Sequence, residues 1–120
     1  MKMSSLIDET VEKLKIERIY VCYQKLYKPI YEHLISEQCK SRIEILQVDD
    51  MEYTELKEHL NVLNEQDLLI LIMPFYVSGT DSEIMHNLLI NLEKKGVYFI
   101  NISAGVEGIK FTNKAQKLYN

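Results

Sequence analysis

Six consecutive large apolar residues, from Leu68 to Met73, place the strongest constraint on the fold of this 120-residue chain. They stand between Asp67 and Pro74, and six residues before a proline are too few for a buried helix. A strand that is apolar on both faces is typical of the interior of a parallel sheet. The segment therefore predicts a central parallel strand whose sheet is covered by helices on both faces.

Extended and helical patterns alternate along the rest of the chain. Concentrations of Ile, Val, Leu and aromatic residues predict strands at residues 16–23, 42–48, 68–73 and 97–102. Apolar residues at helical spacing predict helices at residues 4–15, 29–35, 53–63 and 80–95, and a short last helix is compatible with Phe111, Ala115 and Leu118. Strands that alternate with helices form parallel sheets through right-handed crossovers. We therefore expect residues 1–120 to form a single α/β domain with a three-layer, doubly wound sheet and an extra N-terminal helix.

Local signals predict where the helices begin and end. Three pairs of residues have the spacing of a capping box: Ser5 with Asp8, Asp49 with Glu52, and Thr80 with Glu83. Gly96 predicts the end of the helix that opens near Thr80, because the residue after a helix commonly adopts a positive φ angle.

Composition and charge exclude several classes of protein. The net charge is −4 and Lys and Arg are scattered, whereas a nucleic-acid-binding protein normally carries a basic face. The longest apolar run, Leu68 to Val77, is ten residues broken by Pro74, about half of what a membrane-spanning helix needs. No apolar signal-peptide core appears near the N-terminus. We expect a cytoplasmic protein that contacts neither nucleic acid nor membrane.

The residue types that most often carry chemistry are dispersed. The two cysteines, Cys22 and Cys39, have no second Cys or His at ligand spacing, so no metal site is expected. The histidines are predicted to lie on helix surfaces: His33, His59 and His86. Asp49 and Asp50 follow the second strand, where helix capping is a simpler role than catalysis, and a receiver-like domain would need its phosphoacceptor after the third strand. Glu107 is a further possible loop ligand without support from its neighbours.

Ligands of doubly wound sheets bind beyond the carboxyl ends of the strands, where the strand order reverses. Three segments of this chain are expected to meet there: Tyr23 to Lys28, Pro74 to Thr80, and Ser103 to Gly108.

Residues 67–105 resemble the NADPH-dependent FMN reductase branch of the flavodoxin-like superfamily. The resemblance rests on a buried strand, a Pro-x-Tyr turn, a pair of small residues, a helix with an Asn-containing apolar face, and a second strand ending in a Gly-containing loop. These features are Leu68 to Met73, Pro74-Phe75-Tyr76, Ser78-Gly79, residues 86–92, and Ser103-Ala104-Gly105. The resemblance implies strand order 2-1-3-4, bound FMN and an NAD(P)H-dependent oxidoreductase or electron-transfer activity.

The same resemblance implies roles for particular residues. The turn formed by Pro74, Phe75 and Tyr76 would lie along the flavin ring, with Tyr76 as the aromatic side chain against it. Backbone groups of Val77, Ser78 and Gly79 would bond the polar edge of the ring. Ser103, Ala104 and Gly105 would line its other side.

The loop after the first strand departs from this pattern. Related proteins bind the FMN phosphate there through backbone N–H groups of a Ser/Thr-rich or Gly-rich turn. Residues 23–29 contain no Ser, Thr or Gly, and Pro29 lacks an N–H, which leaves Lys25 and Lys28 to supply charge. The alternative is a flavodoxin-like module without a cofactor that acts through protein contacts.

Members of the family normally have a fifth strand and a last helix, and this chain is expected to be too short to form both. The strand at residues 97–102 would then form a sheet edge without a charged residue to discourage pairing. A partner is expected to cover it, most simply in a homodimer. Candidate interface residues lie on the first helix: Leu6, Ile7, Val11 and Leu14. The alternative is that this helix or the C-terminal tail folds over the edge of its own sheet.

Overall fold

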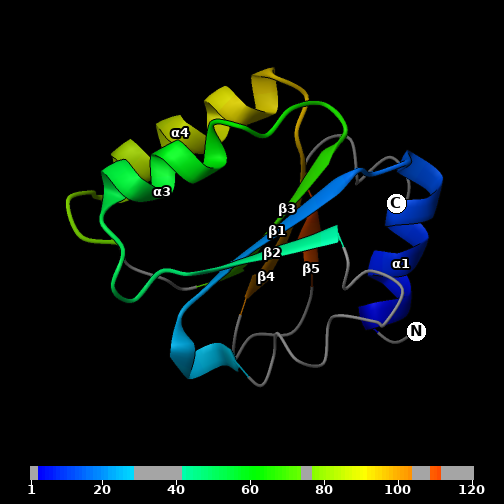
Figure 1. The fold of residues 1–120 in the computed structure, drawn as a ribbon, viewed down its shortest axis with the longest axis horizontal. Coiled ribbons are helices and arrows are strands. Elements are labelled where there is room, and N and C mark those ends of the chain that lie inside the picture. Colours follow the sequence, from blue (N-terminus) through cyan, green and yellow to red (C-terminus); the bar gives the residue numbers. More distant parts are fainter. Residues whose placement is uncertain (1–2, 29–41, 74–76, 104–108, 112–120) are drawn as a thin grey trace.

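The computed structural model describes the backbone of residues 3–28, 42–73, 77–103 and 109–111 (Figure 1). Along the chain the elements are α1 (Met3–Leu14), β1 (Arg18–Tyr23), the short 3₁₀ helix η1 (Lys25–Tyr27), β2 (Ile43–Gln47), α3 (Tyr53–Leu60), β3 (Asp67–Met73), α4 (Ser82–Lys94), β4 (Tyr98–Ser103) and β5 (Ile109–Phe111). The four predicted strands all form, and the predicted helix at residues 29–35 lies outside the described residues.

The strands form one sheet in the order β2-β1-β3-β4-β5. The first four in this order are parallel, which confirms the predicted order 2-1-3-4. At its centre, Ile70 of β3 pairs with Val21 of β1 on one side and with Ile100 of β4 on the other. The fold is therefore of the α/β class and consistent with a flavodoxin-like topology.

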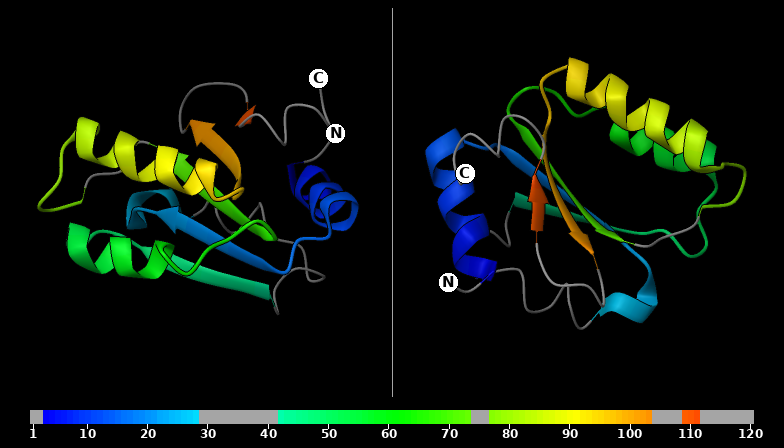
Figure 2. Two further views of the ribbon diagram at one scale, coloured as in Figure 1. Left: turned by 90° about the horizontal axis from the view of Figure 1, so that it is seen from above. Right: turned by 180° about the vertical axis from the view of Figure 1, so that it is seen from behind.

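Helices cover both faces of the sheet, as expected for three layers. Helices α3 and α4 lie side by side on one face, and α1 lies on the opposite face (Figures 1 and 2). The chain passes from β2 through α3 to β3, and from β3 through α4 to β4, in the same direction across the sheet. Two right-handed crossovers in one direction place their helices on the same face.

The residues of β3 alternate between two hydrophobic cores. Leu69 and Leu71 belong to the core beneath α3 and α4, whereas Leu68, Ile70 and Ile72 belong to the core beneath α1. All five are at most 1% exposed. The continuous apolar run of this strand thus reflects burial on both faces.

Helix α1 is part of the fold rather than a free surface. Ile7 and Val11 are 1% and 5% exposed, and they share a core with β1, β3 and β4. Leu14 packs against the same core, while the side chain of Leu6 lies outside the described residues. The prediction that Ile7 and Val11 form an interface with another subunit is therefore wrong, because the sheet of the same chain buries them.

Strand β4 does not end the sheet, although the sequence predicted that it would. Strand β5 pairs with β4 in antiparallel orientation, with Ile109 opposite Ile102 and Phe111 opposite Ile100. Phe111 therefore lies in a strand and not in a last helix. The chain covers this edge with its own tail, the alternative to a dimer, and thereby satisfies backbone groups that would otherwise invite pairing.

Two of the predicted helix starts are misplaced by a few residues. Asp81, rather than Thr80, caps α4, since its carboxylate accepts a hydrogen bond of 2.9 Å from the backbone N–H of Ile84. Helix α1 begins at Met3, so Ser5 lies inside it. Gly96 follows the C-cap of α4 with a φ of 95°, which confirms the predicted end.

Candidate functional site

The carboxyl edge of the sheet contains the switch point on which a doubly wound fold centres its ligand site. Strands β1 and β3 are neighbours, and the chain leaves β1 toward β2 on one side and β3 toward β4 on the other. Met73 at the end of β3 pairs with Ser103 at the end of β4. The loops after β1, β3 and β4 therefore start from adjacent positions, as the sequence predicts.

The loop after β1 is bonded to the residues that follow β2. The N–H of Val48 donates to the carbonyl of Tyr23 at 3.0 Å, which extends the pairing of these strands by one step. The carboxylate of Asp49 then accepts a hydrogen bond of 2.7 Å from the backbone N–H of Lys25, the first residue of η1. Asp49 thus serves the loop after β1.

The predicted capping box of α3 is consequently wrong. The N-cap of this helix is Glu52, and neither its own side chain nor that of Asp49 caps the helix in the predicted way. Asp49 bonds to η1 because the pairing of β2 with β1 places Asp49 beside the end of β1. There the backbone N–H of Lys25 requires an acceptor, which the Asp49 carboxylate provides.

The end of the loop after β3 is bonded to the same segment. The N–H of Tyr53, the first residue of α3, donates to the carbonyl of Ser78 at 2.7 Å, and Glu52 forms a parallel bridge with Ser78. Val77 is buried in the core beneath α3 and α4. Gly79 has a φ of 84°, a conformation that glycine adopts without strain. Residues 77–79 are therefore held in a defined backbone conformation.

Residues 48–53 join the two predicted loops, a role that the sequence prediction missed. Lys25 and Ser78 lie in different loops, and each bonds to this segment through its backbone. The signal was available in the sequence: Asp49 lies two residues after the end of β2, and β2 was expected beside β1. Several predicted site residues lie outside the described residues: Pro74, Phe75, Tyr76, Ala104 and Gly105.

The two ends of the expected FMN site differ in how well their residues suit the cofactor. Residues 77–79 offer an ordered backbone for a ring, although the Ser78 carbonyl already accepts the Tyr53 N–H. At the phosphate end, the Lys25 N–H already donates to a carboxylate, and Asp50 and Glu52 are exposed beside Asp49 in the sequence. Among the described residues of this loop, the Lys25 N–H is therefore already engaged, and the neighbouring carboxylates would oppose the charge of a phosphate group.

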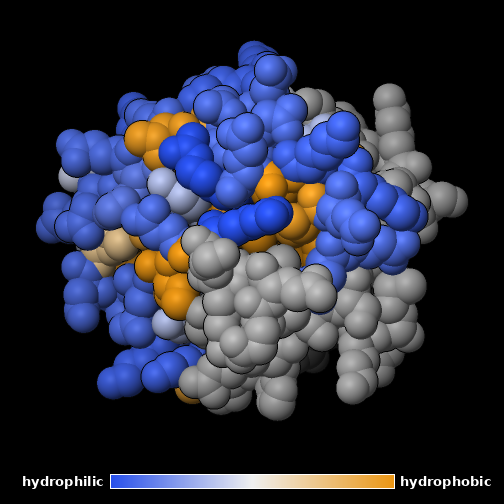
Figure 3. Space-filling model, turned by 45° about the vertical axis from the view of Figure 1, so that its right-hand side comes forward, coloured by the Kyte–Doolittle hydropathy of each residue, from blue (hydrophilic) through white to orange (hydrophobic). Residues whose placement is uncertain are grey.

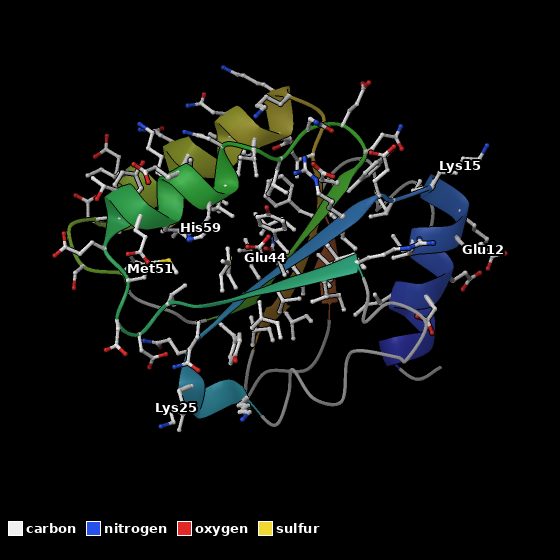
Figure 4. All side chains as sticks on the ribbon, in the orientation of Figure 1. Glu12, Lys15, Lys25, Glu44, Met51 and His59 are labelled. Atoms are coloured by element: carbon white, nitrogen blue, oxygen red, sulfur yellow. The ribbon has the colours of Figure 1, made fainter. Side chains whose placement is uncertain are left out.

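The lysines of the loop after β1 do not reverse this conclusion. The side chains of Lys25 and Lys28 are both exposed. Figure 4 shows the Lys25 side chain extending outward from η1, away from the sheet. An exposed lysine is a mobile point charge, whereas phosphate sites use several N–H groups fixed toward one position.

Other titratable groups lie away from this edge. Burial raises the pKa of the Tyr20 hydroxyl, and its hydrogen bond to Glu44 on the neighbouring strand raises this pKa further. Glu44 lies near the amino end of β2, an edge strand of the sheet (Figure 4). Burial also raises the pKa of the Cys22 thiol, to about 12. His86 is exposed on α4, as predicted, and His59 on α3 is half-buried.

The described part of the chain contains neither a metal-binding cluster nor a membrane-spanning helix. Within residues 3–28, 42–73, 77–103 and 109–111, no three His, Cys, Asp or Glu side chains are grouped so that they could hold a metal ion. None of the helices in this part of the chain combines the length and the apolar character that crossing a bilayer requires.

Comparison of the chain with protein-family models, curated proteins and solved structures gives no match. The support for a function therefore comes from the fold and from the contacts at the carboxyl edge of its sheet.

Proposed function

We propose that this chain binds a flavin at the carboxyl edge of its sheet and acts as an NAD(P)H-dependent flavin oxidoreductase or electron-transfer protein. The observation that carries the proposal is the parallel order β2-β1-β3-β4, which puts the loops after β1 and β3 side by side at the switch point. Flavodoxin-like sheets with this order bind their flavin at that position. A bound flavin would supply the redox chemistry, and the protein would hold and orient it.

The ring would lie against the segment that follows β3. Tyr76 would supply the aromatic surface, and the backbone of residues 77–79 would bond the polar edge of the ring. The Tyr53–Ser78 hydrogen bond and the positive φ of Gly79 support this role, since a backbone already held in one conformation loses less entropy on binding. Ser103, at the end of β4, starts the segment proposed for the other side of the ring.

A flavin titration tests the proposal directly. Quenching of flavin fluorescence by the purified protein should be saturable, and replacement of Tyr76 by Ala should weaken binding by about 1–3 kcal/mol, the scale of an aromatic stack. Tyr76→Phe is the matched control because it keeps the ring and should keep most of the affinity. Equal affinities of the Ala and Phe variants would remove Tyr76 from the site, and the absence of any saturable quenching would contradict flavin binding.

The second candidate is a cofactor-free module that acts through protein contacts. The hydrogen bond between Asp49 and the Lys25 N–H favours it, because this bond engages a backbone donor of the loop in which a cofactor phosphate would be expected. Leu26 in the same loop is a large apolar residue that is 77% exposed. The described surface visible in Figure 3 is otherwise mostly hydrophilic, with small separate apolar areas. A colourless protein that binds no flavin in the titration would support this candidate.

The expected location and assembly are separate proposals. A cytoplasmic protein should be recovered in the cytosolic fraction of its cell. A homodimer would give about twice the 14.1 kDa mass of one chain in light scattering. Because β5 covers β4, a dimer would have to form through another surface than the one expected from the sequence.

A further inference from the structure

We infer that the flavin taken by this site lacks a phosphate group, so that the preferred ligand is riboflavin rather than FMN. The inference rests on the proposed flavin binding and concerns the end of the site that would receive the ribityl chain. Its basis is the bond of 2.7 Å between the carboxylate of Asp49 and the backbone N–H of Lys25.

The Asp49 carboxylate lies against the loop after β1, the region in which doubly wound folds bind the phosphate of a nucleotide. In a doubly wound fold, the anion is bound by backbone N–H groups of the turn after β1, at the start of the following helix. In the described part of this turn, the N–H of Lys25 already donates to Asp49. The chain has thus supplied its own anion at this position.

A phosphate would meet two costs at this position. It would have to displace Asp49 from the Lys25 N–H, and its charge of about −1.5 to −2 would then lie beside that same carboxylate. Asp50 and Glu52 are exposed on the same short segment and add negative charge. Like charges at such separations oppose each other, most strongly where the protein lowers the local dielectric constant.

A ribityl hydroxyl meets neither cost. A carboxylate has lone pairs for about four hydrogen bonds, so Asp49 can accept from a hydroxyl while it keeps the Lys25 N–H. A hydroxyl that donates to an ionised carboxylate forms one of the stronger hydrogen bonds in proteins. The same residue therefore repels the phosphorylated ligand and accepts the unphosphorylated one.

The first test compares riboflavin with FMN in fluorescence titrations at low salt. We expect riboflavin to bind about tenfold or more tightly than FMN, since about 1.4 kcal/mol of repulsion corresponds to a factor of ten. Raising the salt concentration to about 1 M, where the Debye length is about 3 Å, should reduce the ratio. A ratio that does not change with salt would overturn the electrostatic basis of the inference.

The second test removes the charge of Asp49. Asp49→Asn keeps an oxygen that can accept from Lys25 but removes the charge, so it should weaken riboflavin binding, which loses its charged acceptor, and raise FMN affinity about tenfold. Asp50→Asn is the matched control, because it makes the same change in net charge at an exposed neighbour that is not the one bonded to Lys25. Equal gains in FMN affinity in the two variants would overturn the role of Asp49.

The outcomes separate the inference from the function on which it rests. If riboflavin binds more tightly than FMN, and the ratio of the two affinities falls in Asp49→Asn, both the inference and the proposed flavin binding are supported. FMN binding as tight as or tighter than riboflavin in the unmodified chain overturns the inference and leaves flavin binding intact. Failure of both ligands to bind, in a protein whose circular dichroism shows the folded α/β structure, overturns the proposed function and the inference with it.

Discussion

Arg18 and Asp67 stand opposite each other on β1 and β3, and the guanidinium binds both oxygens of the carboxylate, at 3.1 Å from Nε and 2.8 Å from Nη2. The Asp67 side chain is fully buried, whereas that of Arg18 is 42% exposed. Asp67 also accepts the backbone N–H of Asn64, and Arg18 also donates to the carbonyl of Val62. This pair ties the turn after α3 to the amino edge of the sheet, opposite the candidate site.

The first prediction is that Arg18→Met destabilises the fold by about 3 kcal/mol, because it leaves a buried carboxylate without its charged partner. Urea denaturation measures the loss. Lys13→Met is the control, since Lys13 pairs with Glu9 at 2.8 Å on the exposed surface of α1 and should cost only about 0.5 kcal/mol.

A double variant checks the reason for this loss. Arg18→Met with Asp67→Asn removes the buried charge but keeps an oxygen for the Asn64 N–H. It should be more stable than Arg18→Met alone. If Arg18→Met costs no more than Lys13→Met, the pair has no special structural role.

The second prediction concerns the pH dependence that arises from Cys22. Burial raises the pKa of its thiol to about 12, against about 9 for an accessible thiol. Below pH 9 the thiol is protonated in both states, and its contribution to stability is complete. Between pH 9 and 12 only the unfolded chain releases the proton, so stability falls as pH rises, by up to about 1.4 kcal/mol per pH unit.

Urea denaturation between pH 8 and pH 10 measures this slope. Cys22→Ala should have lower stability at every pH and a shallower decline above pH 9, because it has no thiol to ionise. Parallel declines in the two proteins would show that the thiol is not protected. Thiol labelling in a Cys39→Ser background should likewise proceed only as the chain unfolds.

The third prediction concerns Gly79 in the candidate site. Its φ of 84° strains other residues, although a Cβ atom built there would lie 3.8 Å from the Cβ of Tyr53, an ordinary contact. Gly79→Ala should therefore cost about 1–2 kcal/mol through backbone strain alone. Gly79→Asn should cost less, because Asn tolerates positive φ better. Equal losses measured by urea denaturation would show that φ is not the cause.

The fourth prediction concerns the protection of β4 by β5. Lys110 pairs with Asn101 in the middle of this short strand, and Lys110→Pro fixes the backbone φ at about −65°, which disfavours the extended conformation that pairing requires. The exposed edge of β4 should then recruit other chains, so that light scattering at tens of micromolar reports a larger mass than for the unmodified protein. Lys110→Arg keeps both the charge and the N–H and should leave the mass unchanged. The same mass for Lys110→Pro would indicate that β5 does not protect the edge.

Much of the fold follows from short-range patterns in the sequence. The apolar run at residues 68–73 predicted β3, and alternation of strands with helices predicted a parallel sheet with helices on both faces. Gly96 predicted the end of α4. Each of these features depends on neighbouring residues alone, since the apolar pattern of a segment records which of its faces are buried.

Other features depend on which segments meet in space. The apolar residues of α1 show that this helix must be buried, and a partner subunit would have satisfied them as well as the chain's own sheet does. Likewise, residues 109–111 carry no strong strand signal, and β5 exists because the edge of β4 offers backbone groups to pair with. In both cases tertiary structure decided between alternatives that the sequence left open.

Within the candidate site, Asp49 shows the same difference between what the local sequence determines and what tertiary contacts determine. The sequence by itself determined that a carboxylate follows β2 and that the loop after β1 lacks Ser, Thr and Gly. Only the tertiary structure decided that this carboxylate turns to the N–H of Lys25 rather than to the start of α3. The physical reason is that a hydrogen bond requires contact within about 3 Å, and the pairing of β2 with β1 brings residues 24 positions apart in the chain to that distance.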